Sequence, residues 1–208
     1  MTGFSVSLFV SNLSNVASYL SPIFESIPST KVVPAQIEKV VSLVSRTGRD
    51  LQRYDTSGYR QVVGCVPYRY KKQEVNGIET TEIEVLLISA QKGKGMLFPK
   101  GGWEMDESME EAALRETIEE AGVTGELQGK IGKWQYKSKR HNIIHDGYMF
   151  ALLVSQEFEL WPEAEIRQRR WVSLDEAREV CHNWWMREAL EAFVNLKCLT
   201  NDESWNLN

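Results

Sequence analysis

Cysteine is scarce in this chain of 208 residues, and its three cysteines are an odd number at wide spacing. Cys65, Cys181 and Cys198 form no Cys-x-x-Cys pair. This set argues against a secreted disulfide framework and against a structural zinc site, and it favours a reducing compartment. A chain of this length with 42% hydrophobic residues can bury a full core without disulfides.

A basic excess and a long apolar run are also absent. The formal net charge is −5, whereas a general nucleic-acid binder carries a strong positive charge, so no nucleic-acid partner is expected. No apolar stretch has the length needed to span a bilayer, so no membrane partner is expected either. The negative total still allows an anionic small molecule, because local charge clusters decide such binding.

The first thirty residues contain no lysine or arginine, one acid (Glu25) and eight serines. A Ser-rich, acid-poor leader is typical of an organelle transit segment, and the missing arginines argue against a mitochondrial one. We therefore predict a chloroplast location, with a disordered tail in the cytoplasm as the alternative. The predicted organisation is a leader (1–36), one domain (37–197) and a C-terminal tail (198–208), while the oligomeric state is not readable from the sequence.

Hydrophobic patterns predict a domain of the α/β (α+β) class. Strands are expected at 60–70, 82–90, 130–136, 146–155 and 170–172. A polar turn is expected at 71–77 and a glycine-rich loop at 91–103. Helices are expected at 37–44, 106–121 and 174–196, the last with a break near His182 and Asn183. This order predicts a mixed sheet covered by helices.

The predicted helix at 106–121 carries three glutamates on one face. Asp106 is a suitable N-cap, and Gly122 is a natural stop. At about 100° per residue, Glu116, Glu119 and Glu120 fall within an arc of roughly 100°. The helix therefore gathers three carboxylates on one side.

The other residues of this helix complete the helical wheel. Leu114, Ile118 and Ala121 fall on the side opposite the acids, where we expect them to pack on a sheet. Ala112 falls among the acids, and its small side chain is expected to leave open space beside them.

Carboxylates crowded on one face repel one another unless something compensates them. Mg²⁺ and Mn²⁺ prefer oxygen ligands, so a divalent cation would supply the compensation. Such an ion polarises a phosphoryl oxygen and lowers the pKa of bound water. Arg115 and Glu107 are placed to support the carboxylates. By itself, however, an acidic helix is more often a solvated surface.

The spacing of the whole segment is more specific than the acids alone. Gly101 is followed after five residues by Glu107, and after seven more by the run Arg115 to Val123, which reads RETIEEAGV. This segment resembles the Nudix box, in which Arg-Glu-U-x-Glu-Glu-x-Gly-U ends the motif and U is a bulky apolar residue. Thr117 departs from the pattern at the first U position, as a smaller and more polar residue.

The resemblance implies a Nudix fold, a mixed sheet in an α/β/α sandwich, and an enzyme that hydrolyses a diphosphate linked to a further group with Mg²⁺ or Mn²⁺. It implies that Glu116 and Glu120 are metal ligands and that Glu119 is a third ligand or the general base. It leaves the base open between Glu119 and Glu120 and gives Arg115 and Glu107 supporting roles. A non-catalytic Nudix sensing domain is the rival, and such domains typically lose one of these acids.

The flanks of the box resemble the diphosphoinositol polyphosphate and diadenosine polyphosphate branch of the family, particularly its plant members. The resemblance is carried by 53–60, 98–104, 161–163 and 169–171, and it extends over about 43–197. It favours a diphosphoinositol polyphosphate as the substrate, with a dinucleoside polyphosphate or another nucleoside diphosphate derivative as the alternative.

Basic residues in the loops around the helix predict a pocket for a polyphosphate. A dinucleoside polyphosphate would also need an aromatic slot, for which Trp134, Tyr136, Tyr148 and Trp161 are candidates, although such residues are more often core. The candidate substrate-binding residues are Arg53, Arg60, Lys92, Lys94, Lys100, Gly101, Gly102, Lys137, Lys139, Arg140, His141 and Arg169.

Overall fold

Seven strands form one mixed sheet within residues 44–75, 77–91, 95–138 and 142–204, which the computed structural model describes. They are β1 (Arg60–Val75), β2 (Ile78–Ser89), β3 (Met96–Leu97), β4 (Lys100–Gly102), β5 (Val123–Lys137), β6 (Ile144–Glu157) and β7 (Arg169–Ser173). The main order is β3-β2-β1-β6-β5, with β4 paired to β1 and β7 paired to β2. β1 and β6 run parallel, and the other pairs are antiparallel.

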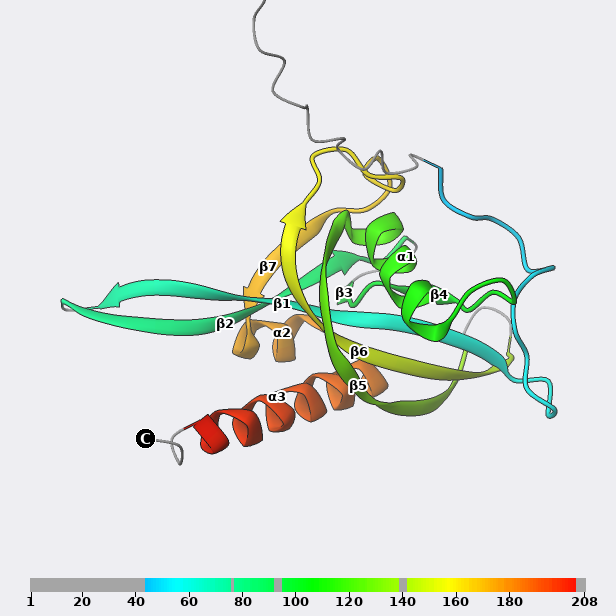
Figure 1. The fold of residues 1–208 in the computed structure, drawn as a ribbon. Coiled ribbons are helices and arrows are strands. Elements are labelled where there is room, and N and C mark those ends of the chain that lie inside the picture. Colours follow the sequence, from blue (N-terminus) through cyan, green and yellow to red (C-terminus); the bar gives the residue numbers. More distant parts are fainter. Residues whose placement is uncertain (1–43, 76, 92–94, 139–141, 205–208) are drawn as a thin grey trace, which may run out of the picture. The chain divides into compact units, whose positions relative to one another are not determined.

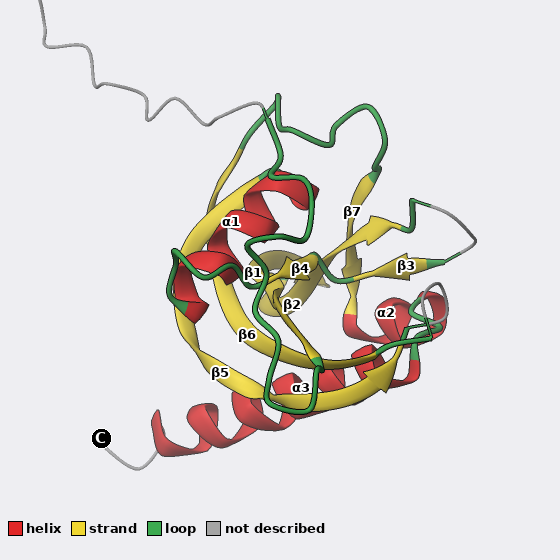
Figure 2. Ribbon diagram, turned by 90° about the vertical axis from the view of Figure 1, so that its right-hand side faces the viewer, coloured by secondary structure: helices red, strands yellow, loops and turns green. Residues whose placement is uncertain are grey.

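Helices cover both faces of this sheet (Figures 1 and 2). α1 (Met109–Ala121) lies on one face, and α2 (Leu174–Val180) and α3 (Trp184–Ser204) lie on the other. The predicted sandwich and the predicted break near His182 and Asn183 are both confirmed. Within the described ranges, none of the helices combines the length and the hydrophobicity that a membrane span requires.

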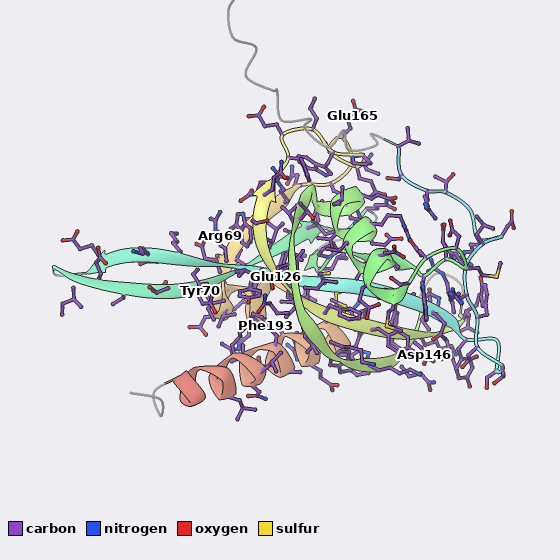
Figure 3. All side chains as sticks on the ribbon, viewed as in Figure 1. Arg69, Tyr70, Glu126, Asp146, Glu165 and Phe193 are labelled. Atoms are coloured by element: carbon purple, nitrogen blue, oxygen red, sulfur yellow. The ribbon has the colours of Figure 1, made fainter. Side chains whose placement is uncertain are left out.

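The alternation of side chains along β1 creates the two cores. Val63 and Cys65 face α1, in a buried cluster with Ala112 and Ala113. Val66 and Tyr68 point to the opposite face of the strand and belong to the cluster that includes residues of α3. On that side the ring centroid of Phe193 lies 5.0 Å from that of Tyr68, and Figure 3 shows Phe193 on α3 beside the sheet. Because both faces are buried, the strand reads as a nearly continuous apolar run.

Several predicted strand boundaries were wrong. The polar stretch at 71–77 is mostly strand, because β1 and β2 continue together as a hairpin that extends beyond the core (Figure 1). Charged side chains stabilise it across the strands, as in the 2.8 Å ion pair between Lys71 Nζ and Glu84 Oε1. β3 and β4 lie within the predicted loop at 91–103, and two or three residues are too few to show a periodic pattern.

Irregular pairing explains the late start predicted for β5. The strand begins at Val123 rather than Lys130, and its register against β6 shifts at three points. These irregularities interrupt the apolar alternation that identifies a strand in a sequence. At the other end, α3 continues to Ser204, so part of the segment predicted as a tail is helical.

The start of α1 also differs from the prediction. Ser108, not Asp106, is the N-cap: its hydroxyl accepts from the Glu111 N–H at 3.1 Å, and the Glu111 carboxylate accepts from the Ser108 N–H at 2.8 Å. This reciprocal pair is a capping box. Gly122 ends the helix as predicted, with a left-handed φ of 64°.

The tight environment of Gly122 leads to a stability prediction. A Cβ added there would lie 2.6 Å from Arg169 Nη1 and 2.7 Å from the Trp161 ring, in addition to the unfavourable positive φ. We expect Gly122→Ala to lower the free energy of unfolding by about 2 kcal/mol or more. Gly58 has a similar φ of 76° and nothing within 4 Å of an added Cβ, so Gly58→Ala should cost only about 1 kcal/mol. Equal losses in urea unfolding would contradict this account.

Candidate active site on helix α1

The three glutamates share one face of α1, as predicted, but this face is buried. Glu116, Glu119 and Glu120 expose only 9%, 8% and 7% of their surface. Ala112 is also fully buried, so the open space predicted beside the acids was wrong. Small side chains let this face approach the sheet closely, and the segment at β4 covers the carboxylates.

The side of α1 opposite the acids packs on the sheet in part, as the wheel predicted. Ala121 is fully buried in a cluster with Leu86, and Leu114 packs against the cluster that contains Val63. Leu114 and Ile118 are half-buried, whereas Thr117 is fully buried. The Thr117 hydroxyl donates to the Ala113 carbonyl at 2.8 Å, which satisfies its polar group inside the core. The departure from the expected apolar residue at 117 is therefore accommodated without an unpaired hydroxyl.

Arg115 holds two of the acids around the helix. Its Nε and Nη2 donate to the two carboxylate oxygens of Glu107 at 2.9 and 2.7 Å. Its Nη1 donates to Glu116 Oε1 at 2.8 Å and lies 3.5 Å from Glu119 Oε2. Nη2 also donates to the Gly102 carbonyl at 2.9 Å, which ties the helix to β4. Arg115 thus joins Glu107 to Glu116, while the supporting roles of Arg115 and Glu107 in catalysis stay a prediction.

The Glu120 carboxylate is held by two residues that lie outside α1. The Lys100 backbone N–H donates to Glu120 Oε2 at 2.8 Å. Arg167, which precedes β7, donates through Nη2 to Glu120 Oε1. Both oxygens of this buried carboxylate therefore have partners that lie far away in the sequence.

Glu119 is held by the segment that precedes β1. The Arg46 backbone N–H donates to Glu119 Oε1 at 3.3 Å, and the Arg46 side chain pairs with Glu104 and Asp106. Asp106 thus belongs to this ion-pair cluster instead of capping the helix.

Burial raises the pKa of all three glutamates. Loss of water is the largest cause at each position, and Arg115 opposes it at Glu116 and Glu119, while Lys100 and Arg167 oppose it at Glu120. For Glu116, burial together with the neighbouring charges of Glu120 and Glu119 raises the pKa to about 8. At each glutamate, burial therefore outweighs the stabilisation of the charged form by the neighbouring cations.

The donor set fits a hard divalent cation. Glu116, Glu119 and Glu120 offer only oxygen atoms, and they are buried with raised pKa values that a cation would reverse. Gly101 adds to the fit, because a Cβ there would collide with the Glu116 carboxylate. No three His, Cys, Asp or Glu side chains in the described part of the chain converge as a ready metal cluster. Instead, Arg115 and Arg167 occupy carboxylate oxygens that a cation would need.

A cavity of about 510 Å³ opens beside the acidic face. Its basic lining consists of Arg60, Lys100 and Lys137, and Gly101 separates it from Glu116. The described residues that line it include no Asp or Glu. The full lining is Arg60, Val62, Ala90, Gly95, Met96, Leu97, Lys100, Gly101, Tyr136, Lys137, Ser138, His145, His182, Asn183 and Trp184.

Some predicted substrate residues lie elsewhere. Arg53 donates to the Glu104 and Met105 carbonyls and lies 4.4 Å from the Trp103 ring centroid, so it supports the segment before α1. Gly102 is buried. Arg169 donates to the carbonyls of Ala121, Gly122 and Phe158, and it stacks on Trp161. Lys92, Lys94, Lys139, Arg140 and His141 lie outside the described residues.

The structure also brings residues to the site that sequence reasoning did not assign to it. Arg167 is not among the candidate residues, because nothing in the sequence shows that its segment packs against α1. His182 and Asn183, at the predicted helix break, and the adjacent Trp184 line the cavity, while Trp185 is core. Trp185 stacks on Tyr136 with centroids 4.4 Å apart, which fixes the turn between α2 and α3 against β5.

Comparisons with known proteins point to one family. Residues 58–193 match the model described as NUDIX domain. The chain is 90% identical to Nudix hydrolase 4 of Arabidopsis thaliana over 98% of both chains. It is 71% identical to Nudix hydrolase 21, chloroplastic, of the same plant, over 94% of this chain and 99% of the relative.

Two more distant matches extend the comparison. Diphosphoinositol polyphosphate phosphohydrolase 3-alpha of Mus musculus is 32% identical, over 66% of this chain and 80% of the relative. Among solved structures, a NUDIX hydrolase from Nitrosomonas europaea has a TM-score of 0.52 at 19% identity, covering 66% of this chain and 89% of that chain. This structural likeness confirms the predicted fold.

The raised pKa of Glu116 predicts how stability depends on pH without metal. The folded protein keeps this proton up to about pH 8, whereas an ordinary glutamate releases it near 4.5. The unfolded state therefore binds fewer protons in this window, and the free energy of unfolding should fall as pH rises through it. Glu116→Gln should show a shallower fall in urea unfolding with EDTA.

Glu110→Gln provides the control, because Glu110 is exposed on the same helix. It should retain the full pH dependence of the unmodified chain. An equally steep fall in Glu116→Gln would contradict the assignment of a raised pKa to Glu116.

Proposed function

The chain belongs to the Nudix family and is a Nudix hydrolase, and from this premise we propose that it hydrolyses a phosphoanhydride bond of a diphosphoinositol polyphosphate. The observation that carries the proposal is the basic cavity beside the buried acids of α1. Three cations and no carboxylate among its described lining residues suit a small molecule with many phosphates.

We assign the metal site to α1. Nudix hydrolases generally need a divalent ion, and Glu116 and Glu120 would hold Mg²⁺ or Mn²⁺ with Glu119 as a third ligand or as the base. The bound ion would polarise the phosphoryl group and activate water. The chain's own residues do the rest: Arg115 orients Glu116, and Lys100 presents its backbone N–H to Glu120.

Basic residues orient the substrate in this proposal. Arg60 and Lys100 are half-buried, and burial lowers the pKa of Arg60 without removing its charge at neutral pH. Lys137 stands exposed at the end of β5, where it lines the cavity. Charge-assisted contacts to phosphate are stronger than neutral hydrogen bonds, so these cations would set the affinity. The 32% identity to a phosphohydrolase named for diphosphoinositol polyphosphate supports this choice.

A dinucleoside polyphosphate is the second candidate because of one feature of the same cavity. Trp184 exposes 53% of its surface and lines the cavity together with Met96 and Leu97. An exposed indole beside apolar side chains offers a surface on which adenine can stack. In this candidate, Arg60, Lys100 and Lys137 would bind the phosphates, and Trp184 would stack on the base.

A panel of substrates tests the reaction and the metal site together. With Mg²⁺, the unmodified protein should release orthophosphate from a diphosphoinositol polyphosphate and cleave dinucleoside polyphosphates more slowly. Glu116→Gln and Glu120→Gln should each lower kcat by more than about 100-fold, since residues that merely support a metal ligand already cost about 10–100-fold. Glu110→Gln should retain activity, and near-normal turnover in both site variants would refute the assignment.

Two cavity variants separate the two substrates. Lys137→Ala should raise KM about tenfold for either polyphosphate with little change in kcat, because it removes a contact to phosphate. Trp184→Ala should raise KM about tenfold for a dinucleoside polyphosphate only, because a stacked base contributes about 1–3 kcal/mol. Lys72→Ala and Tyr70→Ala on the exposed hairpin are the matched controls. An unchanged KM in Lys137→Ala would count against the binding of substrate phosphates by the basic residues of the cavity.

A further inference from the structure

Arg167 is a buried cation that lies outside the Nudix box and contacts its last glutamate. Its side chain is 6% exposed, and each of its nitrogens has a different partner. Nε donates to Glu163 Oε2 at 2.5 Å, Nη1 donates to the Ser89 carbonyl at 3.0 Å, and Nη2 donates to Glu120 Oε1. The guanidinium is therefore held in a fixed position at the end of α1.

The segment that carries Arg167 is itself attached to α1. The Glu163 backbone N–H donates to the Glu119 carbonyl at 3.1 Å, and the Arg167 N–H donates to the Glu163 carbonyl at 2.9 Å. The Gln91 amide also donates to Glu163 Oε2 at 3.2 Å. Movement of the cation away from Glu120 would thus require several of these contacts to change.

The charge balance of α1 shows why a second arginine matters. Arg115 uses its donors on Glu107, Glu116 and the Gly102 carbonyl, and none of its hydrogen bonds reaches Glu120. Without Arg167, the Glu120 carboxylate would keep only the Lys100 N–H as a hydrogen-bond partner within the part of the chain that the structure describes. A carboxylate this buried is strongly unfavourable when its charged partner is removed.

We propose that Arg167 is the positioning counter-cation of Glu120: it orients this carboxylate in the metal-free enzyme and competes with the divalent ion for it. A guanidinium keeps its charge throughout the physiological pH range, so the competition is permanent. The affinity for the ion would then reflect an exchange of one cation for another at Glu120. The competition rests on the proposed metal site, whereas the pairing in the metal-free protein does not.

A double-mutant cycle without metal tests the pairing. In EDTA, Arg167→Met should lower Tm by roughly 10 °C, because it leaves a buried carboxylate unpaired. In a Glu120→Gln background the same substitution should lower Tm by less than half as much. Equal losses in the two backgrounds would overturn the pairing, because they would mean that Arg167 only supports its own segment.

Arg169→Met is the matched control for this cycle. Arg169 is a neighbouring half-buried arginine whose hydrogen bonds all go to main-chain carbonyls. Its loss should lower Tm equally with Glu or Gln at position 120. Coupling between positions 169 and 120 as strong as that of Arg167 would also overturn the specific role of Arg167.

Calorimetric titration of Mn²⁺ without substrate tests the competition. Arg167→Met should bind Mn²⁺ at least about fivefold more tightly, since a nearby positive charge is removed. Arg169→Met should bind as the unmodified protein does. Arg167→Lys keeps a cation beside Glu120, so it should retain near-normal affinity and provides the comparison if the methionine variant does not fold. Unchanged or weaker binding in Arg167→Met, or Arg167→Lys affinity far from normal, would overturn the competition.

The same titration distinguishes failure of this inference from failure of the proposed function. Glu120→Gln should weaken Mn²⁺ binding if Glu120 is a metal ligand. Unchanged binding in Glu120→Gln would refute the metal site and with it the competition, while the metal-free cycle would still decide whether Arg167 pairs with Glu120.

Discussion

The burial of Glu116, Glu119 and Glu120 on one face of α1 is the constraint on which the surrounding structure depends. Like charges in a medium of low polarity are unfavourable unless opposite charge lies close by. The fold supplies Arg115 from the same helix and Arg167 from the segment before β7. Their positions leave the carboxylates ordered but still with raised pKa values, a state suited to the arrival of a cation.

Close packing of α1 on the sheet makes this burial feasible. Small side chains such as Ala112, Ala113 and Thr117 bring the helix near β1 and β6, and the Gly101 backbone then approaches Glu116 directly. Glycine is needed at 101 because of this contact rather than because of a special backbone angle. The glycine and glutamates of the Nudix box are thus parts of one packing arrangement.

The basic cavity is assembled from segments that are distant in the chain. Arg60 begins β1, Lys100 begins β4 and Lys137 ends β5. His182 and Asn183 lie in the turn between α2 and α3, and Trp184 begins α3. The parallel pairing of β1 with β6 and the antiparallel pairing of β6 with β5 bring Arg60 and Lys137 together, and the antiparallel pairing of β4 with β1 adds Lys100. The Trp185 and Tyr136 stack attaches the turn. The proposed metal site and the proposed substrate cavity therefore lie on different elements.

The sequence by itself determined the family, the mixed sheet between helices and the shared face of the three glutamates, because these depend on local spacing and periodicity. It did not show that this face is buried, since Leu114 and Ile118 looked like the better core residues. Only the tertiary structure decided that Arg167 pairs with Glu120, that Arg169 binds main-chain carbonyls, and that Trp184 lines the cavity. Each of these depends on contacts between segments far apart in the chain, and spacing along the sequence carries no record of them.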